Sequence, residues 1–321
     1  MTRILITGAA GMIGKVLLVE LAGEGHEVIA TDLAPRPNDL PDHMRFERMD
    51  VTGDDAASDP AAIIAETKPE VILHLASIVD PPKGLSGKTA RDLAFAVDVT
   101  GTKNVLDAAL ANGVRRLVVT SSGAAYGYHA DNPVPLRESD PVRGNREFPY
   151  SWHKRLVEEM LAGARREHPA LEQVVLRVGT VLGERTDNQI TALFRRPRLL
   201  AIAGSDSPFV FIWTRDLARI LRRAATDGPT GIFNVAGDGA LGISELARIM
   251  HKPVLHLPAI LVKAALAVAH PLGLSRYGPE QVRFLQYRPV LANDALKREF
   301  GYTPEKTSAE TFDLWRQWAG L

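Results

Sequence analysis

Short apolar runs alternate with amphipathic segments through the first half of the chain. The runs at 4–7, 27–31, 45–49, 71–75, 116–121 and 173–178 are rich in Val, Ile and Leu. Between them, the spacing of apolar residues predicts helices over 12–22, 61–66, 91–111 and 150–167. Apolar strands separated by helices are typical of a parallel sheet that is covered on both faces. The pattern therefore predicts an α/β fold with a Rossmann-type, doubly wound sheet.

The first run leads directly into a glycine-rich turn. Residues 7–14 read Thr-Gly-Ala-Ala-Gly-Met-Ile-Gly, and the first predicted helix follows at once. A turn without side chains lets the backbone approach a pyrophosphate, which the N–H groups and the positive end of the helix attract. The second run ends in Asp32, where a carboxylate accepts hydrogen bonds from ribose hydroxyls and repels a 2′-phosphate. A dinucleotide site is predicted that prefers NAD to NADP, with Arg36 nearby to offset part of that repulsion.

The alternation loosens after residue 178, where Pro, Gly and aromatic residues become more frequent. We expect 1–178 to form an NAD-binding domain that also carries the catalytic side chains. Residues 179–321 are expected to form a smaller, mixed region, mainly for substrate, that partly folds back onto the first domain. Further helices are predicted over 216–225, 243–250, 295–300 and 307–318.

An apolar stretch over 257–272 is interrupted by Lys263, His270 and two prolines, below the length of a bilayer span. It predicts a half-buried helix. A helix that lies on a membrane surface is the alternative, which the small positive charge of its polar face disfavours.

Charge and composition narrow the expected partners. Lys and Arg together number 38, as do Asp and Glu, and no basic block occurs. We therefore expect a small, neutral or modestly charged substrate, with no nucleic-acid or membrane partner. Cysteine is absent, which excludes disulfides, thiolate nucleophiles and cysteine-based metal sites, and no metal is expected. A cytoplasmic protein is expected, because a reducing compartment fits this composition and no signal peptide is recognised before the first strand.

Two serines end the fifth run, and a Tyr/Lys pair begins the next helix. Ser121 and Ser122 stand where a parallel sheet opens toward its ligand, while Tyr150 and Lys154 are four apart and share a helix face. Such a pair alone is usually a tyrosine packed under a lysine stem. Here Pro149 marks the first turn of a helix that follows the Ser122 strand, which favours chemistry. A lysine ammonium and an oxidised nicotinamide would lower the phenol pKa, so that Tyr150 exchanges a proton as hydride moves.

Taken together, these motifs resemble the extended short-chain dehydrogenases/reductases, the superfamily that contains NAD-dependent sugar-nucleotide epimerases and dehydratases. The resemblance covers essentially the whole chain. It rests on motifs at 7–14, 32, 50–51, 74–77, 101–105, 121–127, 150–154, 177–183, 216–218, 233–235 and 300–304. The family implies an NAD enzyme, often a homodimer that pairs through the helices predicted over 91–111 and 150–167.

The resemblance also implies a role for each motif. Tyr150 would be the acid/base, Lys154 would hold the nicotinamide ribose, and Ser122 would orient the reacting oxygen. The implied cofactor contacts are Gly8, Gly11, Met12, Ile13 and Gly14 at the pyrophosphate, Asp32 at the ribose with Leu33 beside it, Asp50 and Val51 at the adenine, and Leu75, Ala76, Ser77, Thr120 and Val178 along the rest of the cofactor, with Tyr150 and Lys154. From the residues alone, Asp50 is also typical of a turn and Asp216 of a helix N-cap.

Several departures from the family concern the substrate. Asp98 replaces the usual Asn and alters a hydrogen bond on the cofactor side. Thr180 and Phe209 stand where sugar-nucleotide enzymes commonly carry Asn and Arg, and a phenyl ring cannot hold a diphosphate. Gly123 and Ala124 replace the Asp-Glu pair of the dehydratases, so dehydration by that route is not expected.

Three functions are compatible with these motifs and departures. The first is NAD-dependent hydride transfer to or from a secondary alcohol or ketone, with Ser122, Thr180 and Phe209 near a fairly apolar or uncharged substrate. The second is a sugar-nucleotide epimerase that keeps NAD tightly bound. The third is a non-catalytic NAD-sensing protein, which the intact Tyr150 and Lys154 disfavour. His153, between these two residues, is expected to point outward or to be structural.

Overall fold

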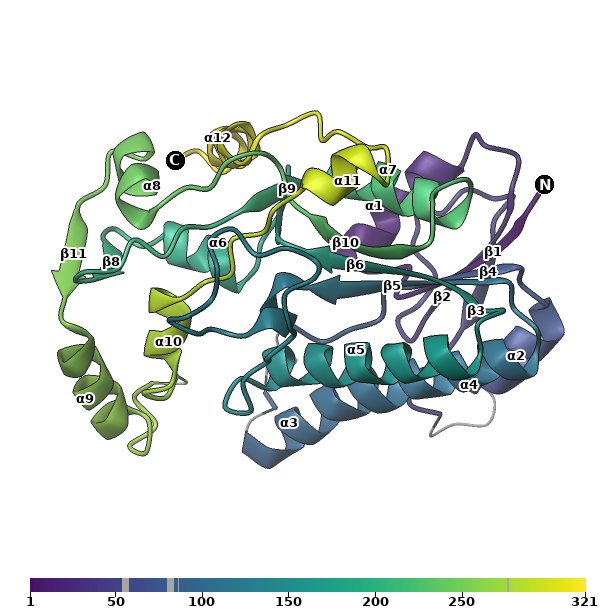
Figure 1. Ribbon diagram of the computed structural model, residues 1–321, viewed down its shortest axis with the longest axis horizontal. Helices are drawn as coiled ribbons and strands as arrows, with labels where there is room; N and C mark the ends of the chain where they lie inside the picture. Colours follow the sequence, from purple (N-terminus) through teal and green to yellow (C-terminus); the bar gives the residue numbers. More distant parts are fainter. Residues whose placement is uncertain (54–57, 80–83, 86, 276) are drawn as a thin grey trace.

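A parallel sheet of seven strands forms the centre of the protein. The computed structural model describes residues 1–53, 58–79, 84–85, 87–275 and 277–321. The strands are β1 (Arg3–Thr7), β2 (Glu27–Asp32), β3 (Arg45–Arg48), β4 (Val71–His74), β5 (Arg116–Ser122), β6 (Glu172–Val178) and β10 (Gly231–Val235). They lie in the order β10-β6-β5-β4-β1-β2-β3 (Figure 1). The chain leaves β1 in both directions across the sheet, so the doubly wound fold predicted from the sequence is confirmed.

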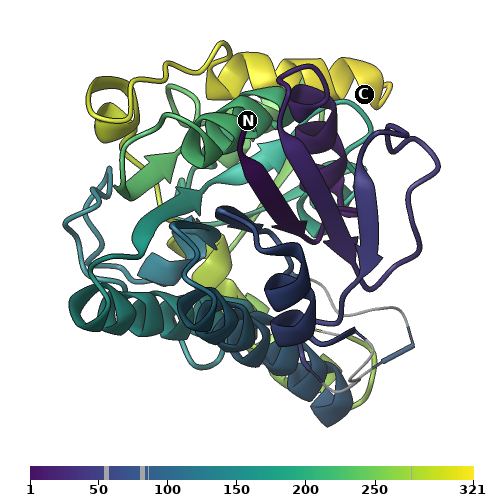
Figure 2. The ribbon, with the colours of Figure 1, turned by 90° about the vertical axis from the view of Figure 1, so that its right-hand side faces the viewer.

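Helices cover both faces of this sheet (Figures 1 and 2). The helices on one face are α1 (Met12–Leu21) and α7 (Thr214–Ala225), and those on the other are α2 (Pro60–Thr67), α4 (Gly101–Ala111) and α5 (Pro149–Glu167). Alternate residues of β1 serve the two layers, because side chains along a strand point to opposite faces. Ile4 and Ile6 pack with the first layer and Leu5 with the second, and all three are fully buried.

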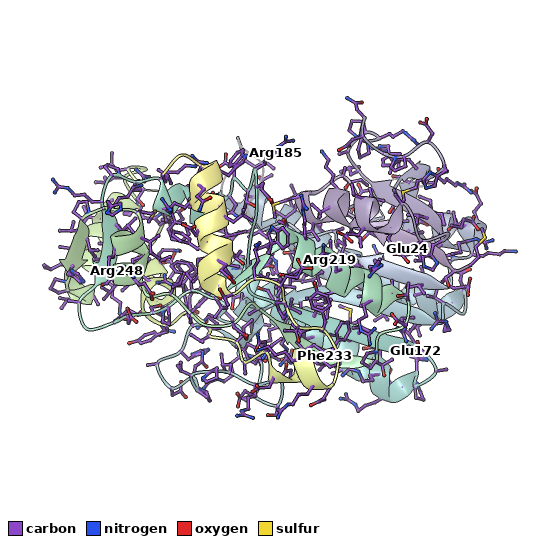
Figure 3. The ribbon with its side chains drawn as sticks, turned by 90° about the horizontal axis from the view of Figure 1, so that it is seen from above. Glu24, Glu172, Arg185, Arg219, Phe233 and Arg248 are labelled. Atoms are coloured by element: carbon purple, nitrogen blue, oxygen red, sulfur yellow. The ribbon has the colours of Figure 1, made fainter. Side chains whose placement is uncertain are left out.

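The second half of the chain contributes both to this sheet and to a smaller lobe. β10, α7 and α11 (Asp294–Arg298) belong to the central layers, and β10 pairs with β6. The other elements are β7 (Thr180–Leu182), α6 (Gln189–Phe194), β8 (Leu199–Ile202), β9 (Phe211–Trp213), α8 (Ile243–Ile249), β11 (Val254–Leu257), α9 (Ala259–Ala269), α10 (Gln281–Gln286) and α12 (Ser308–Trp318). Seen from above, Arg248 of the lobe lies at the opposite end of the molecule from Glu24 and Glu172, which precede or begin strands (Figure 3). The lobe therefore stands on the side of the carboxyl ends.

Two sequence predictions differ from the structure. The stretch predicted as a half-buried helix forms α9, in which Val262 is the buried residue, so most of this apolar helix is exposed. Asp216 does not cap α7, which begins at Thr214 after Trp213. Its fully buried carboxylate instead accepts hydrogen bonds from the Tyr302 hydroxyl at 2.7 Å and the Glu305 N–H at 2.9 Å. Asp216 therefore has a structural role, in which it anchors the C-terminal segment.

Among the described helices, none combines the length and apolarity needed to cross a bilayer.

Candidate functional site

The glycines after β1 are required by close contacts. Gly8 has a φ of +70°, and a Cβ there would lie 2.8 Å from the Ala76 nitrogen. A Cβ on Gly14 would lie 2.5 Å from the carbonyl oxygens of both Gly8 and Ala9. Helix α1 then starts at Met12 with no side-chain cap and no acidic residue in its first turn. Its leading N–H groups are therefore directed at the space beyond β1, where an anion such as a pyrophosphate fits.

Asp32 and Asp50 lie at the carboxyl ends of the next strands. The Asp32 carboxylate accepts hydrogen bonds from the Ala10 N–H in the glycine turn and from the Ala34 N–H, both at 2.9 Å. Asp32 thus lies directly beside the turn, with Leu33 half-exposed next to it. The Asp50 carboxylate accepts from the Thr52 N–H at 3.0 Å, so it forms a turn, and the ribose and adenine contacts stay predictions.

The ends of β1 and β4 are joined through Thr7. Its hydroxyl accepts hydrogen bonds from the N–H groups of Leu75 and Ala76, each at 3.2 Å, and lies 2.8 Å from Nδ1 of His74. The other ring nitrogen of His74 lies 3.0 Å from the Thr102 hydroxyl. These bonds hold 75–77 against the glycine turn, as a cofactor-lining segment requires.

Stability at low pH is expected to depend on His74. Burial, with the nearby charge of Lys154, lowers the pKa of His74 from 6.5 to about 3. As the pH falls below 6.5, the unfolded chain binds a proton here that the folded chain does not. Each further pH unit, down to about pH 3, then costs up to about 1.4 kcal/mol of unfolding free energy. Urea unfolding at neutral and acidic pH measures this effect. Between the two pH values, His74→Asn should lose less unfolding free energy than the unmodified protein, whereas a substitution of the exposed His43 should lose as much as the unmodified protein.

Ser122, Tyr150 and Lys154 come together at the carboxyl end of β5. The Ser122 hydroxyl lies close enough to the Tyr150 phenol to lower its pKa, and it accepts a hydrogen bond from the Ala124 N–H at 3.1 Å. Lys154 is buried beside them, with Nζ 5.5 Å from the centre of the Tyr150 ring, and it donates a hydrogen bond to the Thr120 carbonyl at 3.0 Å. Register pairs Ser122 with Val178 on β6, which brings a further predicted residue to the same edge. The spacing in the sequence thus predicted a real cluster.

Electrostatics at Tyr150 differ from the sequence expectation. Burial and the negative charge of Asp98 raise the pKa of Tyr150, and the nearby Ser122 hydroxyl opposes them only in part. Burial lowers the pKa of Lys154, while Asp98 and Glu158 act in the opposite direction. The phenol is therefore protonated at neutral pH in this arrangement, and lowering its pKa requires a further positive charge.

Asp98 and His153 form a buried pair behind these residues. The helix predicted over 91–111 consists of α3 (Gly87–Phe95), a π turn over Ala96–Thr100, and α4, and the π turn carries Asp98. Such turns are frequent at functional sites. The Asp98 carboxylate lies 3.0 Å from Nδ1 of His153 and accepts from the Ser77 hydroxyl and the Ile78 N–H, each at 2.8 Å. Burial would raise the pKa of Asp98, but the His153 hydrogen bond and the charge of Lys154 outweigh it and lower that pKa. His153 points inward and is structural.

Aromatic residues form the wall on the lobe side. The Tyr128 ring packs edge-on against Phe148 and Phe284, with centroids 4.8 and 5.3 Å apart. The Tyr128 hydroxyl is close enough to Tyr150 and Arg288 for their charges to affect its pKa, which burial raises. Arg288 lies 3.8 Å from the centre of the Phe209 ring and donates a hydrogen bond to the Ser207 carbonyl at 2.9 Å. Burial lowers the pKa of Arg288 to about 9.

The two predicted substrate residues occupy different settings. Thr180 begins β7, directly after β6, and is partly exposed. Phe209 is 2% exposed, and its ring packs on Phe194 and Phe211 as well as under Arg288. Thr180 is thus available to a ligand, whereas Phe209 acts on the site mainly by supporting Arg288.

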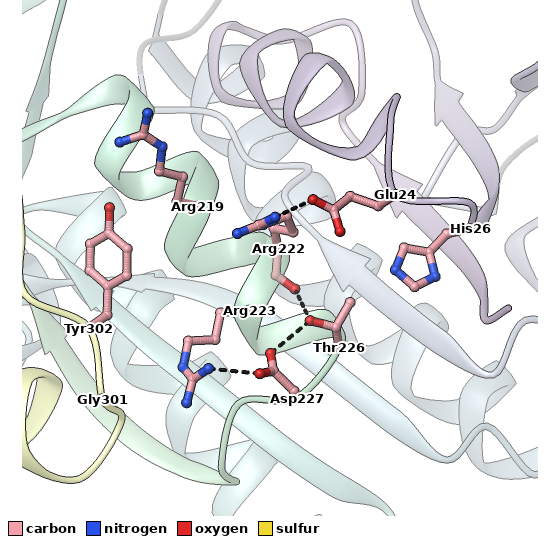
Figure 4. A pocket seen from close by; sticks show the side chains of 9 residues that line it. All are labelled: Glu24, His26, Arg219, Arg222, Arg223, Thr226, Asp227, Gly301 and Tyr302. Carbon is pink, nitrogen blue, oxygen red and sulfur yellow. Dashed lines mark hydrogen bonds and ion pairs between the residues drawn. The ribbon is translucent and has the colours of Figure 1, made fainter.

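A separate hollow of about 420 Å³ lies at the amino ends of the strands, away from these residues (Figure 4). Three arginines of α7 line it, and each has an acidic partner: Arg222 pairs with Glu24, Arg223 with Asp227, and Arg219 with Glu305. The charges of these arginines are thus balanced by acidic side chains, and none of the predicted site residues lines the hollow. Within the described parts of the chain, no cluster of His, Cys, Asp or Glu suited to a metal ion occurs.

Comparison with known proteins agrees with this geometry. Residues 4–236 match the NAD dependent epimerase/dehydratase family. The chain belongs to that family. NAD is accordingly the cofactor of its family, and the predicted resemblance is confirmed. Among solved structures, the UDP-glucose 4-epimerase of Thermotoga maritima with UDP-glucose is similar in fold to this chain, with a TM-score of 0.75. Its sequence is 20% identical, over 99% of this chain and 98% of that one.

Two further proteins are similar to this chain in sequence. An uncharacterized protein of Mycobacterium tuberculosis is 26% identical over 326 aligned residues, which cover 99% of this chain and 84% of that protein. A 3-beta-hydroxysteroid dehydrogenase of Mycolicibacterium neoaurum is 35% identical over 153 residues, which cover 46% of this chain and 37% of that protein. The whole-chain similarity is therefore distant, and the higher identity is confined to under half of the chain.

Sequence reasoning missed three contributors to the site. Tyr128 directly follows the Tyr126-Gly127 motif, which was the available signal for its position near the cofactor edge. Nothing in the local sequence shows that Arg288 is buried, because its burial depends on distant residues. The inward direction of His153 could have been suspected from Asp98, since an acid in place of the usual Asn calls for a partner.

Proposed function

We propose that this chain is an NAD-dependent oxidoreductase that transfers hydride between nicotinamide and a secondary alcohol or ketone. The observation that carries the proposal is the cluster at the carboxyl end of β5, in which the half-buried Ser122 and Tyr150 lie beside the buried Lys154. A phenol that lies close to a hydroxyl and is flanked by an ammonium is suited to exchanging a proton with a substrate oxygen.

The glycine turn and the adjoining strand ends are proposed to hold NAD. Gly8 and Gly14 leave room for a pyrophosphate, Asp32 receives the adenosine ribose, and Lys154 holds the nicotinamide ribose. When bound, NAD supplies the hydride acceptor or donor and, in its oxidised form, a positive charge. Ser122 orients the substrate oxygen toward the phenol of Tyr150.

Proton transfer is proposed to occur at the Tyr150 oxygen. With a raised pKa, the phenol donates its proton to a ketone oxygen as that carbon is reduced. In the reverse direction, the Tyr150 oxygen accepts the alcohol proton, which requires a lower pKa and hence a positive charge nearby. Lys154 supplies one such charge at a short distance.

An uncharged, fairly apolar substrate suits the wall of the site. Tyr128, Phe148 and Phe284 present aromatic surface, and Phe209 stands where sugar-nucleotide enzymes carry arginine. The relative named as a hydroxysteroid dehydrogenase supports an alcohol substrate. A sugar-nucleotide epimerase is the second candidate, favoured by Arg288, whose guanidinium is able to bind phosphate. We also infer a cytoplasmic homodimer, paired through α4 and α5.

A substrate panel tests the proposal. The protein is incubated with NAD and secondary alcohols, including hydroxysteroids, and separately with UDP-, GDP- and TDP-sugars. We expect NADH to accumulate with an uncharged alcohol and no nucleotide sugar to change. Formation of a sugar epimer without net NADH would support the second candidate instead. NAD binding without turnover of any panel member would favour the NAD-sensing alternative.

Replacing Asp98 with Asn is expected to lower the pKa of Tyr150, because a negative charge close to the phenol is removed. Asn retains hydrogen-bonding capacity toward Ser77 and His153, so the fold should persist. NMR of tyrosine labelled at the ring carbon that bears the hydroxyl follows the titration, and Tyr150→Phe identifies the resonance among six tyrosines. Ser77→Ala is the control, since it removes a hydrogen bond to Asp98 and no charge. An unchanged titration in Asp98→Asn would contradict this electrostatic role.

A further inference from the structure

Exposed large apolar side chains gather on α9 and on the segments that flank it. Ile260 is 73% exposed and Leu274 is 79% exposed. These two residues, together with Leu255, Leu261, Val268 and Leu272, form what we call the α9 patch. Elsewhere, exposed apolar residues such as Val19 and Val134 occur far from this group in the sequence. A soluble surface rarely carries so concentrated an apolar group without a partner.

Helix α9 is apolar on both its inner and its outer face. Val262 is buried and packs with Val282 of α10, which attaches the helix to the lobe. The exposed apolar positions, from Ile260 to Val268, extend over about 160° of the helix circumference at 3.6 residues per turn. In Figure 1 the helix lies at a corner of the molecule, away from the sheet. Its outer face is therefore presented to a partner rather than to the core.

Positive charge accompanies the patch. From Leu246 to Pro279 the sequence contains Arg248, Lys252, Lys263 and Arg276 and no Asp or Glu. Lys263 is exposed on α9 itself, at the border of the apolar face, and His256 and His270 are exposed just before and after the helix. Arg248 is exposed on α8 of the same lobe (Figure 3). An apolar helix face bordered by cations is typical of a helix that lies in a membrane interface.

We propose that the α9 patch docks on a lipid bilayer that contains anionic lipids. The apolar side chains enter the boundary between headgroups and acyl chains, while Lys263 and its neighbours face the phosphates. A second copy of this chain fits less well. A two-fold contact would bring the same basic segment of both copies together, with no acidic residue of that segment to pair with it. The small charge that disfavoured this arrangement from the sequence of 257–272 is increased by the exposed Arg248 of the same lobe.

The α9 patch lies close to the proposed active site, but the docking proposal does not rest on the proposed reaction. Beyond α9, α10 carries Phe284, which packs on Tyr128 in the aromatic wall. Docking would thus place that wall near the bilayer. Vesicle binding is measured without substrate turnover, so the outcome is independent of whether the proposed reaction is right.

Vesicle flotation of the full chain tests the proposal. We expect the protein to float with vesicles of phosphatidylcholine and phosphatidylglycerol, and more weakly with phosphatidylcholine alone. The triple variant Ile260→Ser, Leu261→Ser and Val268→Ser should bind at least about tenfold more weakly, because three apolar side chains no longer leave water. Lys263→Glu should weaken binding only to the anionic vesicles. These side chains are exposed, so circular dichroism and thermal unfolding should confirm that each variant is folded.

The control carries Val19→Ser and Val134→Ser, two exposed apolar residues outside the patch, and should float like the unmodified protein. Three results would overturn the proposal. The unmodified protein stays in the aqueous fraction with both vesicle types. The triple variant floats as well as the control. Sedimentation analysis shows self-association that the triple variant abolishes and the control keeps, which would assign the patch to a second copy.

Discussion

Replacing Tyr150 with Phe is expected to lower kcat by about 100- to 10,000-fold, the range typical of a lost acid/base group. The ring stays in place beside Lys154, so packing is preserved and only the hydroxyl near Ser122 is removed. NAD affinity should be unchanged, because the glycine turn and Asp32 are untouched. Initial rates with the substrate found by the panel, together with NAD titration by calorimetry, measure the two quantities separately.

Tyr128→Phe is the matched control for this substitution. Tyr128 is a second tyrosine of the site and is buried, and its hydroxyl is close enough to interact with Tyr150. If Tyr150 is the acid/base, Tyr128→Phe keeps most of the turnover. The reverse pattern, with loss in Tyr128→Phe and normal rates in Tyr150→Phe, would transfer the role to Tyr128. Normal rates in both variants would exclude a tyrosine mechanism.

The parts of the molecule that the sequence predicted well are those encoded locally. The glycine turn is a run of neighbouring residues, and Tyr150 and Lys154 are four apart on one helix. For the first six strands of the central sheet, the predicted boundaries agree within one residue, because each is a short apolar run bounded by turns. The seventh strand, β10, was not among the predicted strands. Parallel pairing then brings the strand ends to one edge, and with them Ser122 and Val178.

The residues that the sequence could not place are joined by contacts between distant segments. Asp98 and His153 are 55 positions apart, and Arg288 reaches the carbonyl of Ser207, 81 positions earlier. No local pattern specifies such pairs. The exposure of α9 is a similar case, since its apolar sequence is equally compatible with a core helix, and only the packing of the lobe decides.

The raised pKa of Tyr150 shows what this combination of local and distant contacts adds. From spacing alone, Lys154 is the nearest charge and lowers the phenol pKa. The fold adds burial and Asp98, both of which raise it. The protonated phenol of the structure is therefore set by residues outside the Tyr/Lys motif.

Replacing Gly14 with Ala is expected to weaken NAD binding about 100-fold. The added Cβ would lie 2.5 Å from the carbonyl oxygens of Gly8 and Ala9, which are backbone atoms and cannot move unless the turn opens. Overpacking of this kind costs about 1–3 kcal/mol, and the upper value corresponds to about a 100-fold change in an equilibrium constant. Calorimetric titration with NAD gives the affinity, and urea unfolding without NAD gives the stability.

Gly23→Ala is the matched control, because no heavy atom lies within 4 Å of a Cβ built at that position. Gly23 follows α1, the helix that Gly14 helps to begin, so both substitutions test the same helix at opposite ends. Gly23→Ala should leave NAD affinity and stability unchanged. Because Gly14→Ala affects both the turn and the fold, affinity is compared only under conditions where circular dichroism shows both variants folded. Equal NAD affinity in the two folded variants would mean that the turn after β1 does not hold the cofactor.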